Sequence, residues 1–297
     1  MKQLAAILSV FALQACHPTG ADNNASISGS LPSLATVAST QKPLRIVSLD
    51  FCSDQFVLKL VDRDRILAVS PDAVKDFSYM RETAKGLPTV RPTAEDVLIL
   101  EPDLIVRSYG GGPNAESFFE SAGIAVITLG WASDIEGIMS VMRETSRKLG
   151  ESARGEAVIK DMQTRIDALP HPSTRPEALY MTPTGVTTGE GSLIHEMMIT
   201  AGLTNFQKKA GWRSLPLERL VYEKPDMIAA AFYDSQVNDI DAWGAANHPI
   251  ARGQMKNLPT VNLQGAWTSC GGWFLMDAIE ALASAPIAGQ TEPRRDR

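Results

Sequence analysis

Short apolar runs alternate with helical patterns along most of the chain. The runs are rich in β-branched residues, as is typical of buried strands, and the segments between them carry apolar residues at helical intervals. The predicted strands are Leu44–Leu49, Ile66–Val69, Leu104–Val106 and Ala125–Leu129, then a second set at Ala178–Met181, Met227–Phe232 and Thr260–Leu263. Strands separated by helices favour parallel pairing. The pattern predicts an α/β protein of two lobes, each with a largely parallel sheet.

A repeated interval supports the division into two lobes. Glu95 precedes Pro102-Asp103 and an apolar run, and Glu218 precedes Pro225-Asp226 and an apolar run at the same distance. Each Glu is predicted to lie in the first turn of a helix, which ends before the proline because proline cannot continue the hydrogen-bond ladder. The two halves therefore look like copies of one unit.

Between the two sets of strands, residues 134–169 lack proline and carry apolar residues at helical intervals. This pattern predicts a long backbone helix that connects the lobes, about 50 Å in length at 1.5 Å per residue. Gly150 and Gly155 are weak helix formers, so two helices with a kink between them are the alternative.

The amino terminus has the features of an export signal. Lys2 precedes an apolar run from Leu4 to Leu13, and small residues lead to Cys16. This site resembles the bacterial lipobox, which would make Cys16 the site of lipid attachment; an ordinary signal cleaved nearby would leave it unmodified. The predicted organisation is a signal peptide (1–15), a flexible tether (16–42), an N-terminal lobe (43–133), the connecting helix (134–169), a C-terminal lobe (170–290) and a polar tail (291–297).

Composition and charge narrow the class of protein. The chain has 297 residues, of which 44% are hydrophobic and 21% charged, as in ordinary globular proteins. Its 34 acidic residues outnumber 28 basic ones, which argues against a nucleic-acid partner. The longest wholly apolar runs fall short of the roughly 20 residues that a membrane-spanning helix requires.

Catalytic and metal-binding motifs are absent from the sequence. His195-Glu196 begins like a zinc-protease motif, but Ile199 occupies the position of the second histidine. Neither a nucleophile elbow nor a phosphate-binding loop ending in Gly-Lys is present. We therefore expect no catalytic residues, no metal site and no resident cofactor. An enzyme with a motif-poor site, or a protein that binds free metal ions, is the alternative.

The arrangement resembles the class III, or helical-backbone, periplasmic substrate-binding proteins of ABC importers. The segments that carry the resemblance are Arg45–Leu49, Glu95–Val106, Thr187–Gly189 and Trp212–Glu218. The resemblance implies a monomeric, lipid-anchored periplasmic protein that captures a vitamin B12-type corrinoid or an iron–siderophore chelate between its lobes. It further implies that Glu95 and Glu218 meet arginines of the membrane permease, and that Trp212 lies in the ligand cleft.

Ligands of open α/β sheets bind beyond the carboxyl ends of the strands, so the loops that follow the strands should line the cleft. Aromatic faces beside small residues suit a large, flat and partly apolar ligand. The predicted ligand-binding residues are Phe51, Cys52, Ser108, Tyr109, Trp131, Thr188, Trp212, Arg213, Tyr233 and Trp267.

Three features leave alternatives open for the ligand and for the structure of the cleft. Arg107 and Arg213 could neutralise an acidic siderophore or be solvated surface charges. Some corrinoid binders carry an Asp where Ala266 precedes Trp267 here, which weakens the corrinoid interpretation. Cys52 and a later cysteine, Cys270, could form a disulfide, remain free thiols or bind a metal.

Overall fold

The computed structural model describes residues 45–231 and 244–286. The predicted lipid site at Cys16, the predicted ligand residue Tyr233, the tether and the tail lie outside the described residues. Among the helices of the described ranges, none has both the length and the apolar character needed to cross a membrane.

The N-terminal lobe is built on a parallel sheet of short, buried strands. They are β1 (Ile46–Ser48), β2 (Ile66–Ala68), β3 (Leu104–Arg107) and β4 (Ala125–Thr128), in the order β2-β1-β3-β4. Both faces of β1 and β3 are covered, which explains why these strands read as continuous apolar runs rather than as alternating patterns.

The C-terminal lobe repeats this topology. Its parallel sheet contains β5 (Glu177–Met181), β7 (Thr204–Asn205), β9 (Met227–Ala230) and β10 (Thr260–Asn262), in the order β10-β9-β5-β7. When the strands of each sheet are numbered along the chain, both sheets have the order 2-1-3-4. An antiparallel ribbon of β6 (Val186–Thr188) and β8 (Trp212–Ser214), which the apolar pattern did not reveal, adds to this lobe. The predicted fold class of two α/β lobes with parallel sheets is confirmed.

The repeated Pro-Asp sequence has the same structural role in both lobes. The Asp103 carboxylate accepts a hydrogen bond from the Arg45 amide at 3.1 Å, and the Asp103 amide donates to the Arg45 carbonyl at 2.9 Å. Asp226 makes the same pair of bonds to Glu177, at 2.7 and 2.8 Å. Each Asp therefore aligns the start of the third strand of its sheet with the start of the first.

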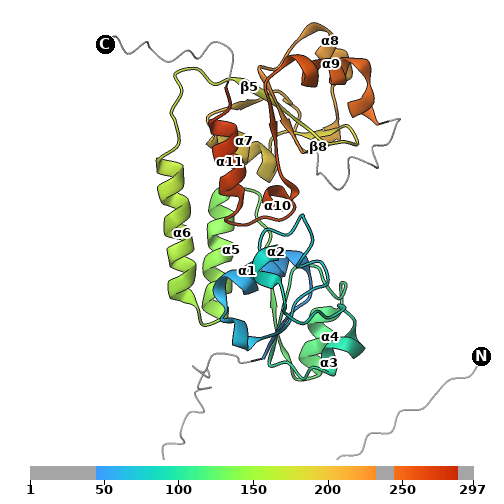
Figure 1. Ribbon diagram of the computed structural model, residues 1–297, viewed down its shortest axis with the longest axis vertical. Coiled ribbons are helices and arrows are strands. Elements are labelled where there is room, and N and C mark those ends of the chain that lie inside the picture. The colour runs from blue at the N-terminus through green and yellow to red at the C-terminus, as the bar shows by residue number, and fades with distance from the viewer. Residues whose placement is uncertain (1–44, 232–243, 287–297) are drawn as a thin grey trace, which may run out of the picture. The chain divides into compact units, whose positions relative to one another are not determined.

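Helices cover the sheets of both lobes (Figure 1). The N-terminal lobe has α1 (Phe51–Leu60), α2 (Arg81–Ala84), α3 (Ala94–Leu98), α4 (Ala115–Ser121) and a 3-10 turn, η1 (Arg63–Arg65). The C-terminal lobe has α7 (Leu193–Thr200), α8 (Leu217–Tyr222), η3 (Ala245–Asn247), α9 (Pro249–Asn257), α10 (Gly265–Thr268) and α11 (Leu275–Ala283). Asp50 and Ser192 cap α1 and α7 through their side chains, as expected for residues that accept from free helix amides.

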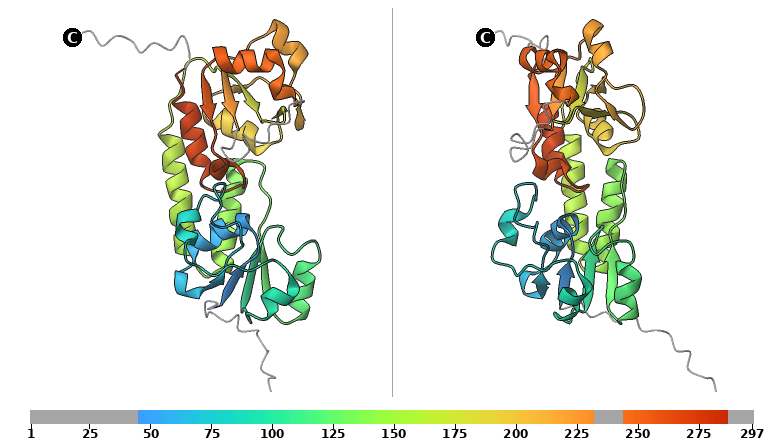
Figure 2. Two further views of the ribbon diagram at one scale, coloured as in Figure 1. Left: turned by 45° about the vertical axis from the view of Figure 1, so that its right-hand side comes forward. Right: turned by 90° about the vertical axis from the view of Figure 1, so that its right-hand side faces the viewer.

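The single long helix predicted for residues 134–169 is wrong. The segment forms two helices, α5 (Ile135–Lys148) and α6 (Ser152–Asp167), which lie side by side (Figures 1 and 2). Gly150 has φ +73°, a left-handed conformation that ends a helix and that side chains disfavour. A Cβ on Gly155 would lie 2.0 Å from the Ser146 Oγ, so this glycine allows the two helices to pack closely. The glycines therefore reverse the chain rather than kink it.

Of the two helices, α6 makes the polar contacts with both lobes. Near its start, Arg154 donates to the Leu60 carbonyl at 2.8 Å and pairs with Asp62. Near its end, Arg165 pairs with Asp277 at 2.6 Å and with Glu280 at 2.7 Å, both on α11. One apolar cluster also extends from the N-terminal sheet through α5 and α6 to α7 and α11. The lobes are therefore joined by a shared core as well as by the chain.

Candidate functional site

A cavity of about 500 Å³ lies between the two lobes. Its walls come from the first two turns of α1 and of α5, from the loops after β3 and β4, from β5 and β8, from the start of α7 and from the segment between α10 and α11. The lining residues are Cys52, Phe56, Ser108, Leu129, Gly130, Trp131, Ala132, Ser133, Ile138, Val141, Tyr180, Gly191, Ser192, Leu193, Ile194, Trp212, Thr268, Ser269, Cys270, Gly271 and Leu275. The loops after β3 and β4 therefore line the cavity as predicted, whereas the described C-terminal part of the lining comes mainly from β8, the start of α7 and the segment from α10 to α11.

Two indole rings from different lobes line the cavity and are largely exposed. Trp131, which follows β4, is 94% exposed, and Trp212 on β8 is 60% exposed. The Trp212 ring also contacts the Tyr180 ring edge-on, with 6.1 Å between centroids. Exposed rings on both sides of a cavity offer flat apolar surfaces that a ligand can cover.

Four of the predicted ligand residues line this cavity: Cys52, Ser108, Trp131 and Trp212. Phe51 and Tyr109 do not line it. Their rings lie 6.2 Å apart, and Phe51 also contacts Phe77 at 4.9 Å, so these three form an aromatic group on the N-terminal lobe.

Thr188, Arg213 and Trp267 also lie outside the lining. Thr188 is fully buried, and its hydroxyl has no hydrogen-bond partner among the described residues. Trp267 packs against the apolar cluster that the lobes share. Arg213 is exposed, donates to the Ala210 carbonyl at 3.0 Å and lies in a different hollow of the surface. None of these three positions favours direct contact with a ligand in the cavity.

Arg107 is neither a ligand-neutralising cation nor a solvated charge, the two roles considered from the sequence. Its guanidinium is buried and donates to the carbonyls of Gly110 and Gly112, both at 2.8 Å. The side chain therefore holds the loop after β3 in place.

Sequence reasoning missed the parts of the lining that come from helices. Ile138 and Val141 belong to α5, and Leu193 and Ile194 belong to α7. The sequence did contain a signal for these residues, because both helices begin directly after a loop that was predicted to line the cleft. The predicted ligand residues Trp131 and Thr188 precede the starts of α5 and α7 by only a few residues.

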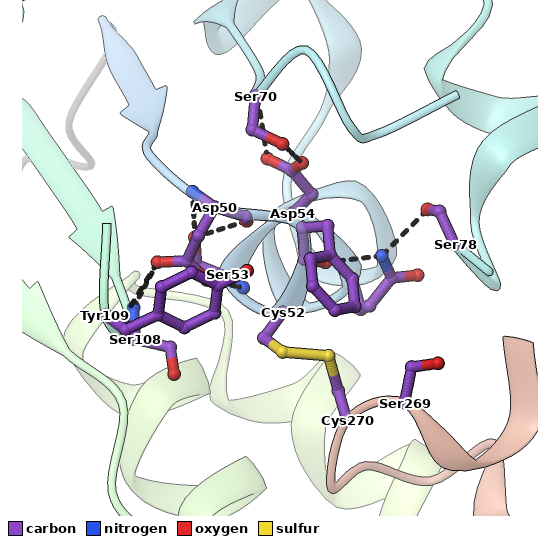
Figure 3. The surroundings of a disulfide bond; sticks show 12 residues. Asp50, Cys52, Ser53, Asp54, Ser70, Ser78, Ser108, Tyr109, Ser269 and Cys270 are labelled. Atoms are coloured by element: carbon purple, nitrogen blue, oxygen red, sulfur yellow. Dashed lines mark hydrogen bonds between the residues drawn. A yellow bond between two sulfur atoms is a disulfide. The ribbon is translucent and has the colours of Figure 1, made fainter. Parts of the chain in front are cut away.

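Asp50 organises the loop at the edge of the cavity (Figure 3). One carboxylate oxygen accepts from the amides of Ser108, Tyr109 and Gly110 at 2.7, 3.1 and 2.9 Å, and the other accepts from the Ser53 amide at 2.9 Å. Partial burial and the negative charge of Asp50 raise the pKa of Tyr109 to about 12, so this phenol stays neutral at physiological pH. Asp50 therefore caps α1 and positions the Ser108 loop at the same time.

A disulfide joins the two lobes in the wall of the cavity (Figure 3). Cys52 lies in the first turn of α1 and Cys270 in the segment before α11, with 5.6 Å between their Cα atoms. Of the three alternatives left open by the sequence, the structure has the disulfide. A hydrogen bond of 2.9 Å from the Tyr79 hydroxyl to Asp277 joins the lobes at a second place. The cavity therefore has a covalent bond across one of its sides.

The described lining of the cavity carries no Asp, Glu, Lys, Arg or His. Its polar groups are mainly hydroxyls, from Ser108, Ser133, Ser192, Thr268 and Ser269. Its two cysteines are bonded to each other, and its only phenol, Tyr180, is 3% exposed. In the part of the chain that the structure describes, no three or more His, Cys, Asp or Glu residues gather in a way that could hold a metal ion.

Glu95 and Glu218 lie where the repeated interval placed them. Each is exposed in the first turn of a short helix, Glu95 on α3 in the N-terminal lobe and Glu218 on α8 in the C-terminal lobe. Within residues 45–231 and 244–286, neither side chain forms an ion pair. Their positions agree with a docking role, and the role itself stays a prediction.

Two α/β lobes, the helix pair that they share and the cavity between them are the architecture of a two-lobed binding protein. The family model for the periplasmic binding proteins matches residues 46–240, and the chain belongs to this family.

Among curated proteins, two cobalamin-binding proteins from strains of Halobacterium salinarum are each 26% identical over 197 residues. The match covers 63% of this chain, and the chain spans about half, 53%, of the length of these relatives.

Solved structures of low sequence identity share the fold. A periplasmic heme-binding protein of Pseudomonas aeruginosa is 22% identical with a TM-score of 0.63, covering 82% of this chain and 95% of its own. A periplasmic heme-binding protein of Vibrio cholerae is 20% identical with a TM-score of 0.66, and the match covers 81% of this chain and 97% of the Vibrio chain. A protein of an Fe3+-hydroxamate transport system from Saccharomonospora viridis is 17% identical with a TM-score of 0.60, covering 81% and 92%.

Proposed function

We propose that this protein is the substrate-binding component of an ABC importer, and that it captures a corrinoid or an iron–siderophore chelate between its lobes. The observation that carries the proposal is the cavity of about 500 Å³, which both lobes line and into which each contributes an exposed indole. Membership of the periplasmic binding protein family supports the transport role. The cobalamin-binding relatives support a chelate as cargo.

The chemistry of the lining favours a chelate whose metal is already fully coordinated. Heme iron requires an axial ligand from the protein, such as an imidazole, a thiolate or a phenolate. The described lining has no histidine and no free thiol, and Tyr180 is almost completely buried. The described lining also offers no cation to compensate the charge of a strongly anionic chelate, which makes such a ligand unfavourable. Corrinoids and ferric hydroxamates supply their own metal donors and carry little net charge, so they suit this cavity better than heme does.

The remaining parts of the chain suit delivery of this cargo to a membrane. Cys16 is the proposed lipid attachment site, so the protein would be tethered in the periplasm and would present Glu95 and Glu218 to cationic sites on the permease. Each lobe contributes one of these carboxylates, so the permease could sense how far the lobes are apart. We propose a monomer that needs no resident cofactor and catalyses no reaction.

The first prediction concerns the ligand. Titration of the purified protein with cyanocobalamin and with a neutral ferric trihydroxamate should quench tryptophan fluorescence for at least one of them, because Trp131 and Trp212 line the cavity. Trp131→Phe and Trp212→Phe should each remove part of the quenching, and Trp131→Ala with Trp212→Ala should weaken binding by about tenfold or more. Hemin and an anionic ferric tricatecholate should bind more weakly.

Trp267→Phe is the matched control, since Trp267 packs in the apolar cluster outside the lining. It should leave the affinity unchanged. If neither neutral chelate binds and hemin does, the proposed ligand class is wrong. If the protein converts any of these compounds into a product, the assignment as a binding protein is wrong.

A further inference from the structure

Two apolar side chains of the lobes are exposed to an unusual degree. Ile99 is 79% exposed and Tyr222 is 88% exposed, and among the large apolar residues described only Trp131 of the cavity is more exposed. Ile99 follows α3 directly, and Tyr222 is the last residue of α8. These are the two helices that carry Glu95 and Glu218.

The two positions are equivalent in the duplicated lobes. Ile99 lies four residues after Glu95, and Tyr222 lies four residues after Glu218. Residues separated by four positions are neighbours on one face of a helix. Ile99 has helical backbone angles, and its amide donates to the Glu95 carbonyl at 3.4 Å, so this spacing holds although Ile99 caps α3.

The positions between follow the same burial pattern in both helices. Two residues after each Glu, Val97 and Leu220 are buried in the core of their lobe. Three residues after each Glu, Leu98 and Val221 are 37% and 55% exposed. Each helix therefore packs on its lobe through one side and presents a carboxylate with two apolar side chains on the other.

Duplication alone does not explain the exposed apolar positions. The buried residues Val97 and Leu220 stabilise their own lobes, so packing accounts for them. Ile99 and Tyr222 stabilise little in the isolated protein, because most of their surface remains in water. A single exposed apolar residue is ordinary. Here, however, two exposed apolar residues follow a carboxylate at the same distance on both lobes, and neither carboxylate has an ion pair among the described residues. This repetition indicates that both faces have the same function.

We propose that Ile99 and Tyr222 are the apolar anchors of the permease-docking surface, each inserting into an apolar socket beside the cation that receives Glu95 or Glu218. This inference rests on the proposed function and adds residues to it. The partner would present the same cationic and apolar site twice, once for each lobe. The carboxylates would speed and orient the encounter, and the burial of Ile99 and Tyr222 would slow dissociation.

The test compares uptake with ligand affinity. Cells that carry the importer but lack their own copy of this protein would express the wild type, Ile99→Ser with Tyr222→Ser, or Glu95→Lys with Glu218→Lys. Uptake of the labelled chelate that binds in the titration, cyanocobalamin or ferric trihydroxamate, is then measured. We expect uptake to fall about tenfold or more in the Ser variant. Its chelate affinity and unfolding midpoint should be unchanged.

Val74→Ser with Phe118→Ser is the matched control. These side chains are 44% and 45% exposed and lie outside α3 and α8, so the control should retain full uptake. If the Lys variant loses uptake and the Ser variant keeps it, the inference is wrong and the proposed docking by carboxylates stands. If both keep uptake, the docking role of Glu95 and Glu218 is itself wrong.

Two further outcomes would overturn the inference. A loss of chelate affinity in the Ser variant equal to its loss of uptake would show that these residues act on the cavity or the fold. A dimer in sedimentation that the Ser substitutions dissociate would show that the exposed faces bind a second copy of this chain.

Discussion

Two carboxylates at the start of α1 have different surroundings although they are only four residues apart. Asp50 accepts four backbone hydrogen bonds, which fix the start of α1 and the loop after β3. Asp54 is completely buried and accepts from the Ser70 amide at 3.1 Å and the Ser70 hydroxyl at 2.6 Å. Burial outweighs the hydrogen bonds of Ser48 and Ser70, which favour the charged form, and raises the pKa of Asp54 from 3.8 to about 7. Asp54 therefore ties the loop after β2 to α1 and makes the lobe sensitive to pH.

Asp54→Asn should reduce the pH dependence of stability. The folded state holds the Asp54 proton up to about pH 7, whereas the unfolded chain releases it near 3.8, so the free energy of unfolding falls as the pH rises between these values. The stabilisation is complete below about pH 4 and is lost as the pH rises through 7. An asparagine can still accept from the Ser70 amide and donate to its hydroxyl, so the variant should lose less stability between pH 5 and 8 in urea titrations.

Asp96→Asn is a suitable control for this experiment. Asp96 is paired with Arg91, which lowers the pKa of the Asp96 carboxyl. The free energy of unfolding of Asp96→Asn should therefore fall between pH 5 and 8 as steeply as that of the wild type. If the free energy of unfolding falls equally steeply with pH in the wild type and in Asp54→Asn, Asp54 does not titrate in this range.

At the scale of elements, the helix pair α5 and α6 depends on two glycines. Gly150 ends the first helix in a left-handed conformation, and Gly155 brings the second helix against Ser146. The apolar pattern of residues 134–169 is the same for one long helix and for two packed helices, because both bury a single apolar stripe. What decides between them is whether the backbones can approach closely, and Gly155 permits that.

Gly155→Ala should therefore destabilise the protein although alanine is the better helix former. The added Cβ would lie 2.0 Å from the Ser146 Oγ and 2.4 Å from its Cβ, so the helices must move apart, at a cost of about 1–3 kcal/mol. Gly253→Ala on α9 is the matched control, since a Cβ there meets nothing within 4 Å. It should raise the free energy of unfolding by about 0.5–1 kcal/mol. Denaturant unfolding of both variants measures the difference, and a neutral Gly155→Ala would contradict the close packing.

At the scale of the whole molecule, the two lobes are restrained by features that lie far apart in the sequence. The disulfide Cys52–Cys270 closes a sequence separation of 218 residues, and Arg165 on α6 bonds to Asp277 and Glu280. Ligand release should therefore require motion that preserves the contact at the disulfide, so that the lobes pivot about it rather than separate uniformly.

Replacing both cysteines, Cys52→Ser with Cys270→Ser, should lower the free energy of unfolding by about 2–5 kcal/mol, because the bond restricts the unfolded chain. The variant should also bind the proposed chelate more weakly, since the wall of the cavity is no longer fixed. Thermal unfolding with and without a reductant measures the first effect, and fluorescence titration measures the second. Reductant should lower the unfolding midpoint of the wild type but not that of the variant. If the midpoints of both respond alike, the disulfide does not account for the stabilisation.

The sequence by itself determined the features that depend on local pattern. Buried strands read as apolar runs, and proline and capping residues mark helix ends, so the first-turn positions of Glu95 and Glu218 and the two-lobed α/β fold followed from the chain alone. The strands of the two parallel sheets were predicted except for the short β7, and the ribbon of β6 and β8 was not predicted. The same reasoning placed Trp131 in the cavity, because loops at the carboxyl ends of parallel strands converge. Trp212 also lines the cavity, but it does so from the antiparallel strand β8.

Only the tertiary structure decided which distant groups meet and which way a side chain points. Thr188 is buried and Trp267 packs in the core, because a loop or ribbon residue can turn towards either side and the sequence pattern does not record which. The pairing of Cys52 with Cys270 and the contact of Gly155 with Ser146 depend on how whole elements pack. Apolar burial drives that packing, and because burial is not directional, the shapes of the assembled surfaces select the partners.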